Sequence, residues 1–505
     1  MLRNKPTFKY NGLTIFMSNP SRFDKTKLIE GGAADMFLAK ECLSPVTNRF
    51  CCDIRLIDSM NEPLLNGTKC VLLLGQRAHQ LYTKLDTSVD EHRGNPIIVG
   101  GIPCISTFSL QDCMDTKNYE KDYMEEHDIA VPSDEFNSAG EEEFVAAKSR
   151  QKTARANYRF WVKHDIRKIV TILENGGEIP KIYEGEPTYH IYPSADVVIE
   201  LLSKTKKQDL FFDIETDFDS IDMRCFAFSF GNDPMNVYVV PTLNTDYKPA
   251  YDKLPQIIRA LKLAIRDNTL VAHNGSSFDF FVLAYLYNIA IGDSVYDTLL
   301  AQHRILPEIE KSLGHCISYY TFEPYHKNEG EHGYYNAQQA NQLYAYCGKD
   351  VFTMWLIKRE QDKLAAKDLG LADSIKWAMR SIRPYLIMTL LGLHYNADER
   401  KAWIKESDAL MTQYLRIMKI LCGPKVPPLI SNKSCTEYFH NQLGYPVVSR
   451  SLKTGNPGLA EDNLLKLRLL VDNPVIDILI KYREKQKETS TLMFKVWMEN
   501  KGAIV

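Results

Sequence analysis

The chain has 505 residues, which is too many for one hydrophobic core and predicts three or four domains. Its formal net charge of −3 at pH 7 excludes a strongly basic protein held on nucleic acid by bulk charge, so any DNA contact must come from local basic patches. The 11 cysteines form no CxxC pair and no apolar run reaches ~18 residues, which excludes a disulfide framework, a zinc module and a membrane span and indicates a soluble cytoplasmic protein.

Residues 1–115 are predicted to form a small α/β domain. Apolar runs at Leu13–Met17 and Cys70–Leu74 predict buried strands, and Gly75 followed by Gln76–Tyr82 predicts a turn into a helix. A strand, a glycine and a helix in this order can place a ligand at the end of the strand. Ordinary packing of a strand and a helix gives the same pattern, and we favour it because no second glycine motif follows.

Four segments of this domain carry a family resemblance, namely residues 30–34 (EGGAA), 73–78 (LLGQRA), 92–94 (HRG) and 105–112 (ISTFSLQD). They resemble the uracil-DNA glycosylase superfamily, in the form found ahead of some phage family-A DNA polymerases. Active members have a histidine in the last motif where this chain has Phe108–Gln111, and no acidic residue is clearly placed near Ser18 to hold the attacking water. We therefore expect binding or scaffolding rather than glycosylase activity. Four basic residues could contact phosphate or could simply lie on a solvated surface, namely Arg77, His79, His92 and Arg93.

Residues 116–185 are predicted to connect this domain to the next one. The polar and acidic composition from Asp115 to Ala147 is typical of a surface linker. Between Lys148 and Trp161, basic and aromatic residues are mixed, which suits single-stranded DNA through phosphate contacts and stacking. An amphipathic helix that packs its aromatic side chains on a domain core explains the mixture equally well.

Residues 186–370 contain a strand that carries two carboxylates. In the apolar run Leu210–Thr216, Asp213 and Glu215 are two positions apart, so both side chains lie on one face of the strand. Two like charges on a buried strand are unfavourable unless a cation neutralises them, which favours a divalent metal. The alternative is that both carboxylates lie at an exposed end of the strand.

Two further acidic motifs follow along the chain. Residues Val271–Asp279 are predicted to form the end of an apolar strand, a turn and the start of a helix. This segment adds a third acidic residue, Asp279. Farther on, Tyr346 and Asp350 are four residues apart and share one helical face, so a phenol and a carboxylate can reach the same point.

The ordered series Asp-x-Glu, Asn-x-x-x-Phe-Asp and Tyr-x-x-x-Asp resembles the three motifs of the DEDD 3'–5' exonucleases, in the subclass with tyrosine. Residues 296–306 and 311–314 resemble the stretch that joins the second and third motifs in the proofreading domains of family-A DNA polymerases. The resemblance implies an RNase-H-like fold and cleavage of DNA with two Mg²⁺ or Mn²⁺ ions. It implies Asp213, Glu215, Asp279 and Asp350 as metal ligands and Tyr346 as the residue that orients the attacking water. It also places Asn274, Phe278 and Thr216 near the terminal nucleotide, with core packing an open alternative for Phe278.

The remaining pattern of residues 186–370 predicts a mixed sheet flanked by helices. The expected elements are a strand at 189–192, a helix at 195–203, the carboxylate strand at 209–215, antiparallel strands within 223–238, a helix at 254–266 and a strand at 269–272.

Residues 371–505 are predicted to be helical. Residues 379–396 resemble the segment that leads from exonuclease to thumb in family-A polymerases, and parts of 432–491 resemble the thumb. Lysine and arginine side chains at helical spacing in this region are consistent with contacts to duplex phosphates and equally with a solvated helix face. The palm and fingers motifs of those polymerases are not found, so we expect no polymerisation without a separate palm-fingers chain.

Together these features predict an α/β protein that is the proofreading part of a family-A replicative DNA polymerase, located in the host cytoplasm if it is phage-encoded. Its expected partners are single-stranded and primer-template DNA and, if the polymerase is naturally split, a palm-fingers chain. The alternatives are an independent 3'–5' exoribonuclease and a non-catalytic DNA-binding or assembly subunit of a split polymerase.

Overall fold

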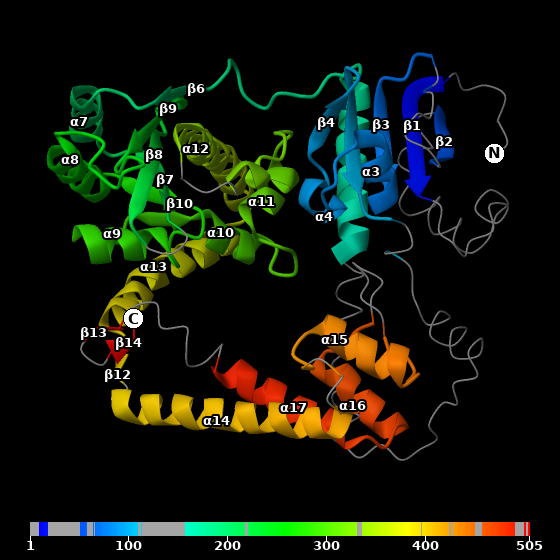
Figure 1. Cartoon of the computed structure of the whole chain (residues 1–505). Coiled ribbons are helices and arrows are strands. Elements are labelled where there is room, and N and C mark those ends of the chain that lie inside the picture. The colour runs from blue at the N-terminus through cyan, green and yellow to red at the C-terminus, as the bar shows by residue number, and fades with distance from the viewer. Residues whose placement is uncertain are drawn as a thin grey trace. The chain divides into compact units, whose positions relative to one another are not determined.

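The computed structural model has a mixed α/β fold that divides into two compact units, Met1–Leu386 and Ile387–Val505 (Figure 1). Among the helices that the structure describes, none combines the length and the apolar character that a membrane crossing requires. The described residues are 10–18, 51–57, 64, 66–109, 113, 157–217, 221–330, 336–394, 396–423, 426, 428–449, 457–489, 499–500 and 503–504.

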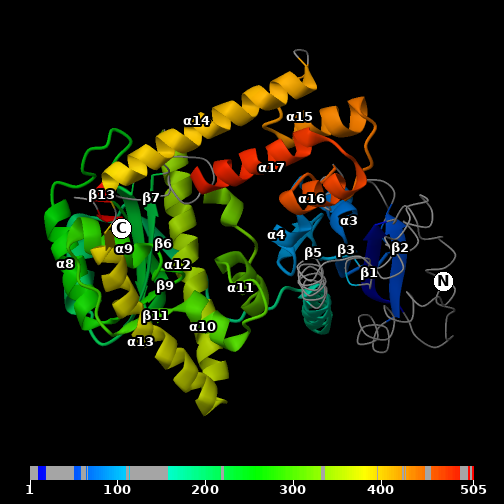
Figure 2. The same ribbon diagram turned by 90° about the horizontal axis from the view of Figure 1, so that it is seen from below.

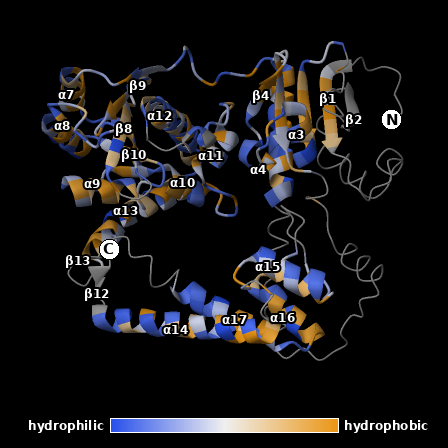
Figure 3. Cartoon of the chain, in the orientation of Figure 1, coloured by the Kyte–Doolittle hydropathy of each residue, from blue (hydrophilic) through white to orange (hydrophobic). Residues whose placement is uncertain are grey.

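The first sheet has five strands in the order β2-β1-β3-β5-β4, and all neighbours are parallel except β4 and β5. The predicted strands at 13–17 and 70–74 and the helix after Gly75 are confirmed. Gly75 has a φ of 94°, a left-handed value that suits the turn from strand to helix. Figure 3 shows β1 as hydrophobic along most of its length, as expected for a buried parallel strand. The elements are β1 (Tyr10–Ser18), β2 (Cys51–Ile57), β3 (Cys70–Leu74), α3 (Gln76–Thr83), α4 (Val89–His92), β4 (Pro96–Val99) and β5 (Ile102–Thr107).

A helix over residues 157–174 completes the core of this sheet. Trp161 is 3% exposed and belongs to the same apolar cluster as Leu13 and Leu72, and Phe160 packs against that cluster. For the described part of the basic and aromatic segment, the packing interpretation therefore holds. The predicted acidic linker and the rest of that segment, like the EGGAA motif at 30–34, lie outside the described residues.

The second sheet has six strands in the order β11-β10-β7-β8-β9-β6. Strand β8 is antiparallel to both of its neighbours, whereas β7, β10 and β11 run parallel, so the predicted mixed sheet is confirmed. The strands are β6 (Thr188–Ile191), β7 (Asp209–Thr216), β8 (Met223–Phe230), β9 (Asp233–Pro241), β10 (Thr269–Ala272) and β11 (Val295–Asp297). The helices are α7 (Ala195–Lys204), α8 (Leu254–Asp267), α9 (Asp279–Tyr287), α10 (Thr298–Ile305), α11 (Leu313–Tyr320), the short 3₁₀ turn η2 (Lys327–Gly330), α12 (Ala337–Ala365) and α13 (Leu369–Leu391).

Helix α12 packs on the central strands β7, β8 and β9 of this sheet (Figure 2). The approach is closest at Gly348, where an added Cβ would lie 2.9 Å from Tyr189 Cδ1 and 3.0 Å from Val239 Cγ2. Because no larger residue fits without a shift, this contact fixes how far α12 lies from β6 and β9 of the sheet that carries Asp213.

The second unit is mainly helical, as predicted, but it also holds a small sheet in the order β12-β14-β13 that the sequence did not predict. Its helices α14 and α17 pack side by side (Figures 1 and 2). Asn396 and Asn473 accept hydrogen bonds from the first backbone N–H groups of these two helices and so set where they begin. The elements are β12 (Leu393–His394), α14 (Ala397–Cys422), α15 (Asn432–Thr436), the π-helix η3 (Glu437–Gln442), α16 (Glu461–Leu470), α17 (Pro474–Lys487), β13 (Glu499–Asn500) and β14 (Ala503–Ile504).

Candidate metal centre

Strand β7 presents Asp213 and Glu215 toward helix α12. The thiol of Cys347 on α12 donates a hydrogen bond to the backbone carbonyl of Asp213, with 3.7 Å between sulfur and oxygen. Ligand atoms of Asp213, Glu215 and Cys347 all lie within 4.8 Å of one another. Both carboxylates are only partly exposed, so the strand does not end in open solvent as the alternative interpretation required.

Asp279 is the first residue of α9 and is 6% exposed. Its Oδ1 accepts a hydrogen bond from the backbone N–H of Ile214, 3.2 Å away, which places this carboxylate beside the β7 strand. Burial raises the pKa of Asp279 to about 7, although the backbone N–H groups that it accepts act in the opposite direction.

Asp350 on α12 is 3% exposed and has two basic partners. His326 Nε2 lies 2.8 Å from Oδ1, and Lys327 Nζ lies 2.5 Å from Oδ2. Burial acts to raise the pKa of Asp350, but the Lys327 ammonium and the His326 ring outweigh it, so the pKa is lowered. Asp350 is therefore ionised at neutral pH.

The four carboxylates act on one another. Burial raises the pKa of Asp213 well above its usual value, and the charges of Asp350 and Asp279 raise it further. Burial also raises the pKa of Glu215, followed by the charges of Asp213 and Asp350. Carboxylates gathered in this way repel each other unless a cation lies among them.

One oxygen of the cluster indicates where a cation fits. Asp213 Oδ2 is buried and has no hydrogen-bond partner among the residues that the structure describes. A buried carboxylate oxygen without a partner is unfavourable, and a hard divalent cation such as Mg²⁺ or Mn²⁺ prefers oxygen ligands of this kind. The oxygens of Asp213 and Glu215 therefore fit a divalent cation, whereas Asp279 and Asp350 are not in the group of described ligand atoms that lie within 4.8 Å of one another.

Tyr346 lies on α12 one turn before Asp350. Burial raises its pKa, and the charges of Asp350, Glu215 and Asp213 raise it further, so the phenol stays protonated. Lys327 Nζ lies 4.3 Å from the centre of the Tyr346 ring. A protonated phenol can hold a water molecule by a hydrogen bond but cannot act as a strong base.

The loop between β10 and α9 is held by Asp297, which is fully buried. Asp297 Oδ1 accepts hydrogen bonds from the backbone N–H groups of Asn274 and Leu299, both at 3.0 Å, and Oδ2 accepts one from Ser276 at 3.1 Å. These bonds support Asn274 in a left-handed conformation with a φ of 60°. Asp297 thus positions the loop that leads to Asp279.

The three residues predicted near the terminal nucleotide are all open to solvent to some degree. Asn274 is exposed, and Phe278 and Thr216 are partly exposed. Phe278 occupies the N-cap position of α9, without a capping hydrogen bond from its side chain.

Sequence reasoning missed the roles of four residues, His326, Lys327, Cys347 and Asp297. Asp297 and Cys347 lie within segments that the sequence analysis describes. A linear motif does not show, however, which carboxylate accepts hydrogen bonds from a loop or which thiol bonds to a strand. The pair His326 and Lys327 offered one signal, adjacent basic residues between two acidic motifs.

Comparisons with known proteins add little to this geometry. No protein-family model matches the chain, and no curated protein matches it. Solved structures that match include the POL domain of Pol1 from M. smegmatis in complex with DNA primer-template and dNTP. The sequence identity is 16%, the TM-score is 0.38, and the match covers 63% of this chain and 52% of that chain, so this chain spans about half of its length. A similarity of this size carries no argument about chemistry, so function is inferred from the carboxylates and their contacts.

Proposed function

We propose that the chain is a metal-dependent 3'–5' exonuclease that acts on DNA and forms the proofreading part of a family-A DNA polymerase. The observation that carries this proposal is the cluster of Asp213, Glu215, Asp279 and Asp350, which come from β7, α9 and α12 and influence one another's pKa. The six-stranded mixed sheet under the cluster supports an RNase-H-like assignment of this domain.

Each side chain has a role in this reaction. The four carboxylates would hold two Mg²⁺ or Mn²⁺ ions, which when bound supply an activated water and neutralise charge on the phosphate. The Tyr346 phenol would orient that water by a hydrogen bond, since it remains protonated. Asn274, Phe278 and Thr216 would contact the terminal nucleotide, and Asp297 would keep the loop of Asn274 in place.

Replacing Asp213 by alanine tests the proposal. Asp213→Ala should lower the Mg²⁺-dependent removal of 3' nucleotides from single-stranded DNA by about a thousandfold or more, because a lost metal forfeits several kcal/mol of transition-state stabilisation. Binding of the same DNA should change little. Asp252→Ala, at an exposed position, is the matched control and should keep the wild-type rate. An Asp213→Ala protein that cleaved as fast as wild type would end the assignment.

The same assay separates the rival functions. Cleavage of a DNA strand faster than an RNA strand of the same sequence favours proofreading, and the reverse favours an exoribonuclease. Restored primer extension on adding a separately encoded palm-fingers chain would support membership of a split polymerase. In that assembly, the helical unit from Ile387 onward is proposed as the thumb.

We propose that the N-terminal sheet belongs to a glycosylase-like domain without glycosylase activity. Phe108 is the first residue of the stretch that stands in place of the family's histidine motif; it is 6% exposed and packs edge-on against Tyr158 with ring centres 4.6 Å apart. The adjacent Thr107 hydroxyl donates to Asp165 Oδ2 at 2.7 Å. A hydrophobic ring and a fully bonded hydroxyl offer no group to stabilise a departing base. Release of free uracil from a uracil-containing oligonucleotide would contradict this.

A further inference from the structure

From the contacts of Lys327 we infer that its ammonium is a resident cation of the carboxylate centre, which leaves Asp350 when divalent metal binds and then pairs with a phosphate of the DNA strand. This inference deepens the proposed function and depends on it for the identity of the substrate. It assigns to Lys327 a substrate-binding role in the exonuclease reaction.

The resting position of Lys327 is defined by two contacts. Its Nζ lies 2.5 Å from Asp350 Oδ2 and 4.3 Å from the centre of the Tyr346 ring. Asp350 Oδ1 has a separate partner, His326, at 2.8 Å. Asp350 therefore keeps its orientation through His326 when Lys327 moves, and only Oδ2 changes its partner.

The charge balance explains why Lys327 has to move. An ammonium and a divalent ion that share one carboxylate oxygen repel each other strongly in a partly buried site. Lys327 has only 24% of its side chain exposed, so its charge also needs a new anionic partner once Asp350 is taken. The phosphate backbone of a bound strand is the anion that the proposed reaction brings to this place.

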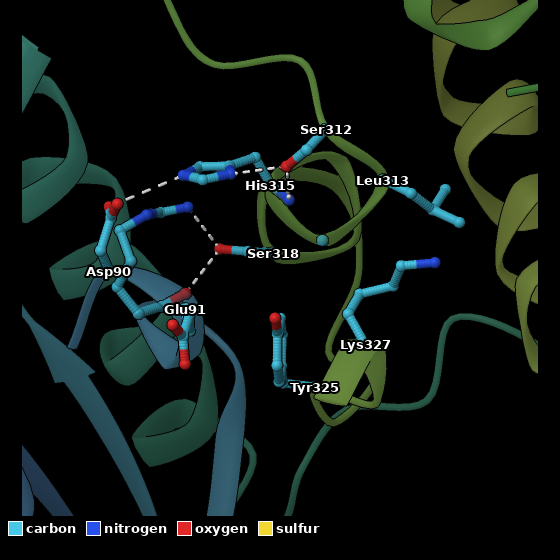
Figure 4. A pocket seen from close by; sticks show the side chains of 10 residues that line it. Asp90, Glu91, Ser312, Leu313, His315, Ser318, Tyr325 and Lys327 are labelled. Atoms are coloured by element: carbon cyan, nitrogen blue, oxygen red, sulfur yellow. Dashed lines mark hydrogen bonds and ion pairs between the residues drawn. The ribbon is translucent and has the colours of Figure 1, made fainter. Parts of the chain in front are cut away.

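The structure also gives Lys327 room to move. Its stem lines a cavity of about 270 Å³, shown in Figure 4, next to Tyr325 and Gly314. A Cβ at Gly314 would lie 3.1 Å from Tyr325 Cε2 and 3.5 Å from Lys327 Cγ, so the glycine keeps space for both side chains. Asp90 and Glu91 lie on the opposite side of the cavity in Figure 4, which keeps a phosphate on the Lys327 side by repulsion.

Manganese affinity in the absence of DNA tests the first half of the inference. Titration of Mn²⁺ into the full chain, followed by calorimetry or by the spin resonance of free Mn²⁺, should show at least about tenfold tighter binding for Lys327→Met, because a competing charge is gone. Damage to the fold would weaken binding, so a gain cannot arise from misfolding. Lys349→Met is the matched control, since Lys349 is the residue before Asp350 but pairs with Glu329 at 2.5 Å, and its affinity should stay at the wild-type value.

Strand binding tests the second half. In Mn²⁺, a single-stranded oligonucleotide with a cleavage-resistant phosphorothioate linkage at its 3' end should bind Lys327→Met about tenfold more weakly than wild type, and Lys327→Arg should recover most of the affinity. Unchanged or weaker Mn²⁺ binding by Lys327→Met, or unchanged strand binding, overturns the inference. If wild type binds Mn²⁺ but cleaves no DNA, the proposed function fails, and tighter Mn²⁺ binding by Lys327→Met would still establish the competition at Asp350.

Discussion

At the scale of single residues, His79 shows how burial keeps a side chain uncharged at a position outside the candidate metal centre. Its side chain is fully buried, with Nδ1 2.8 Å from Ser106 Oγ and Nε2 3.3 Å from Thr87 Oγ1. The ring of His92 stacks on it with 5.5 Å between ring centres. Burial, followed by the charge of His92, lowers the pKa of His79 to about 4. The folded protein therefore holds a neutral imidazole here.

This imidazole makes the N-terminal domain sensitive to acid. Between pH 6.5 and about 4 the unfolded chain binds a proton that the folded protein does not, so the free energy of unfolding falls as the pH falls through that window. From pH 7.5 to pH 5 the loss from His79 should be about 2 kcal/mol, measured by urea unfolding at both values. His79→Gln should flatten this dependence, whereas His303→Gln, at an exposed position, should leave it unchanged. Equal pH slopes for wild type and His79→Gln would contradict the prediction.

Residue types and spacing were enough to predict the acidic cluster but not its partners. Asp213 and Glu215 share a strand face by the period of two, and Tyr346 and Asp350 share a helical face by the period of four, so local geometry alone brings each pair together. Lys327 reaches Asp350 from a 3₁₀ turn between motifs, a contact that only the folded chain creates.

At the scale of elements, the contact of α12 with its sheet sets the position of two site residues. Tyr346 and Asp350 lie on either side of Gly348, the point where the helix comes closest to Tyr189 and Val239. Helix propensity alone favours alanine over glycine by ~1 kcal/mol, so a glycine here is explained by packing and not by the helix itself. The spacing of Tyr346 and Asp350 predicted a shared helical face, but not the glycine contact on which the position of the helix depends.

Gly348→Ala should destabilise the protein despite the gain in helix propensity. The added Cβ forces a shift against Tyr189 and Val239, which we expect to lower the free energy of unfolding by about 1–3 kcal/mol in urea titrations. The proposed exonuclease activity should fall with it because Tyr346 and Asp350 move with the helix. Gly370→Ala, at an exposed position of α13, should be neutral or stabilising. A Gly348→Ala protein as stable as Gly370→Ala would show that the sheet yields at this contact.

At the scale of the whole molecule, a buried polar network joins the N-terminal sheet to helix α11 within the first unit. Asp165 lies on the helix over residues 157–174 and pairs with Arg93 at 3.1 Å. Arg93 donates to Ser318 Oγ at 2.6 Å, and Lys168 donates to the backbone carbonyls of Ser318 and Thr321 at 2.8 and 2.6 Å. Contacts between residues so far apart along the chain carry no local signal, so the sequence predicted separate domains and not this connection.

Removing Asp165 should uncouple the two sheets. Asp165→Ala leaves the buried Arg93 without its carboxylate, which typically costs about 3–5 kcal/mol. We expect urea unfolding to shift to lower concentration and to split into two transitions, seen by comparing tryptophan fluorescence with far-ultraviolet dichroism. The double variant Arg93→Met with Asp165→Ala should recover much of the loss, because no unpaired charge remains. A single wild-type transition for Asp165→Ala would mean that the network contributes no coupling.

Most of the thiols that the structure describes are buried and hard to ionise. Burial raises the pKa of Cys70 to about 12, and it also raises the pKa of Cys347 and of Cys435, which lie in three different cores. Alkylating reagents attack the thiolate, so these sulfurs react only when their own surroundings open. Mass spectrometry of the alkylated chain would then time the opening of each region separately, with reporters that the native protein already contains.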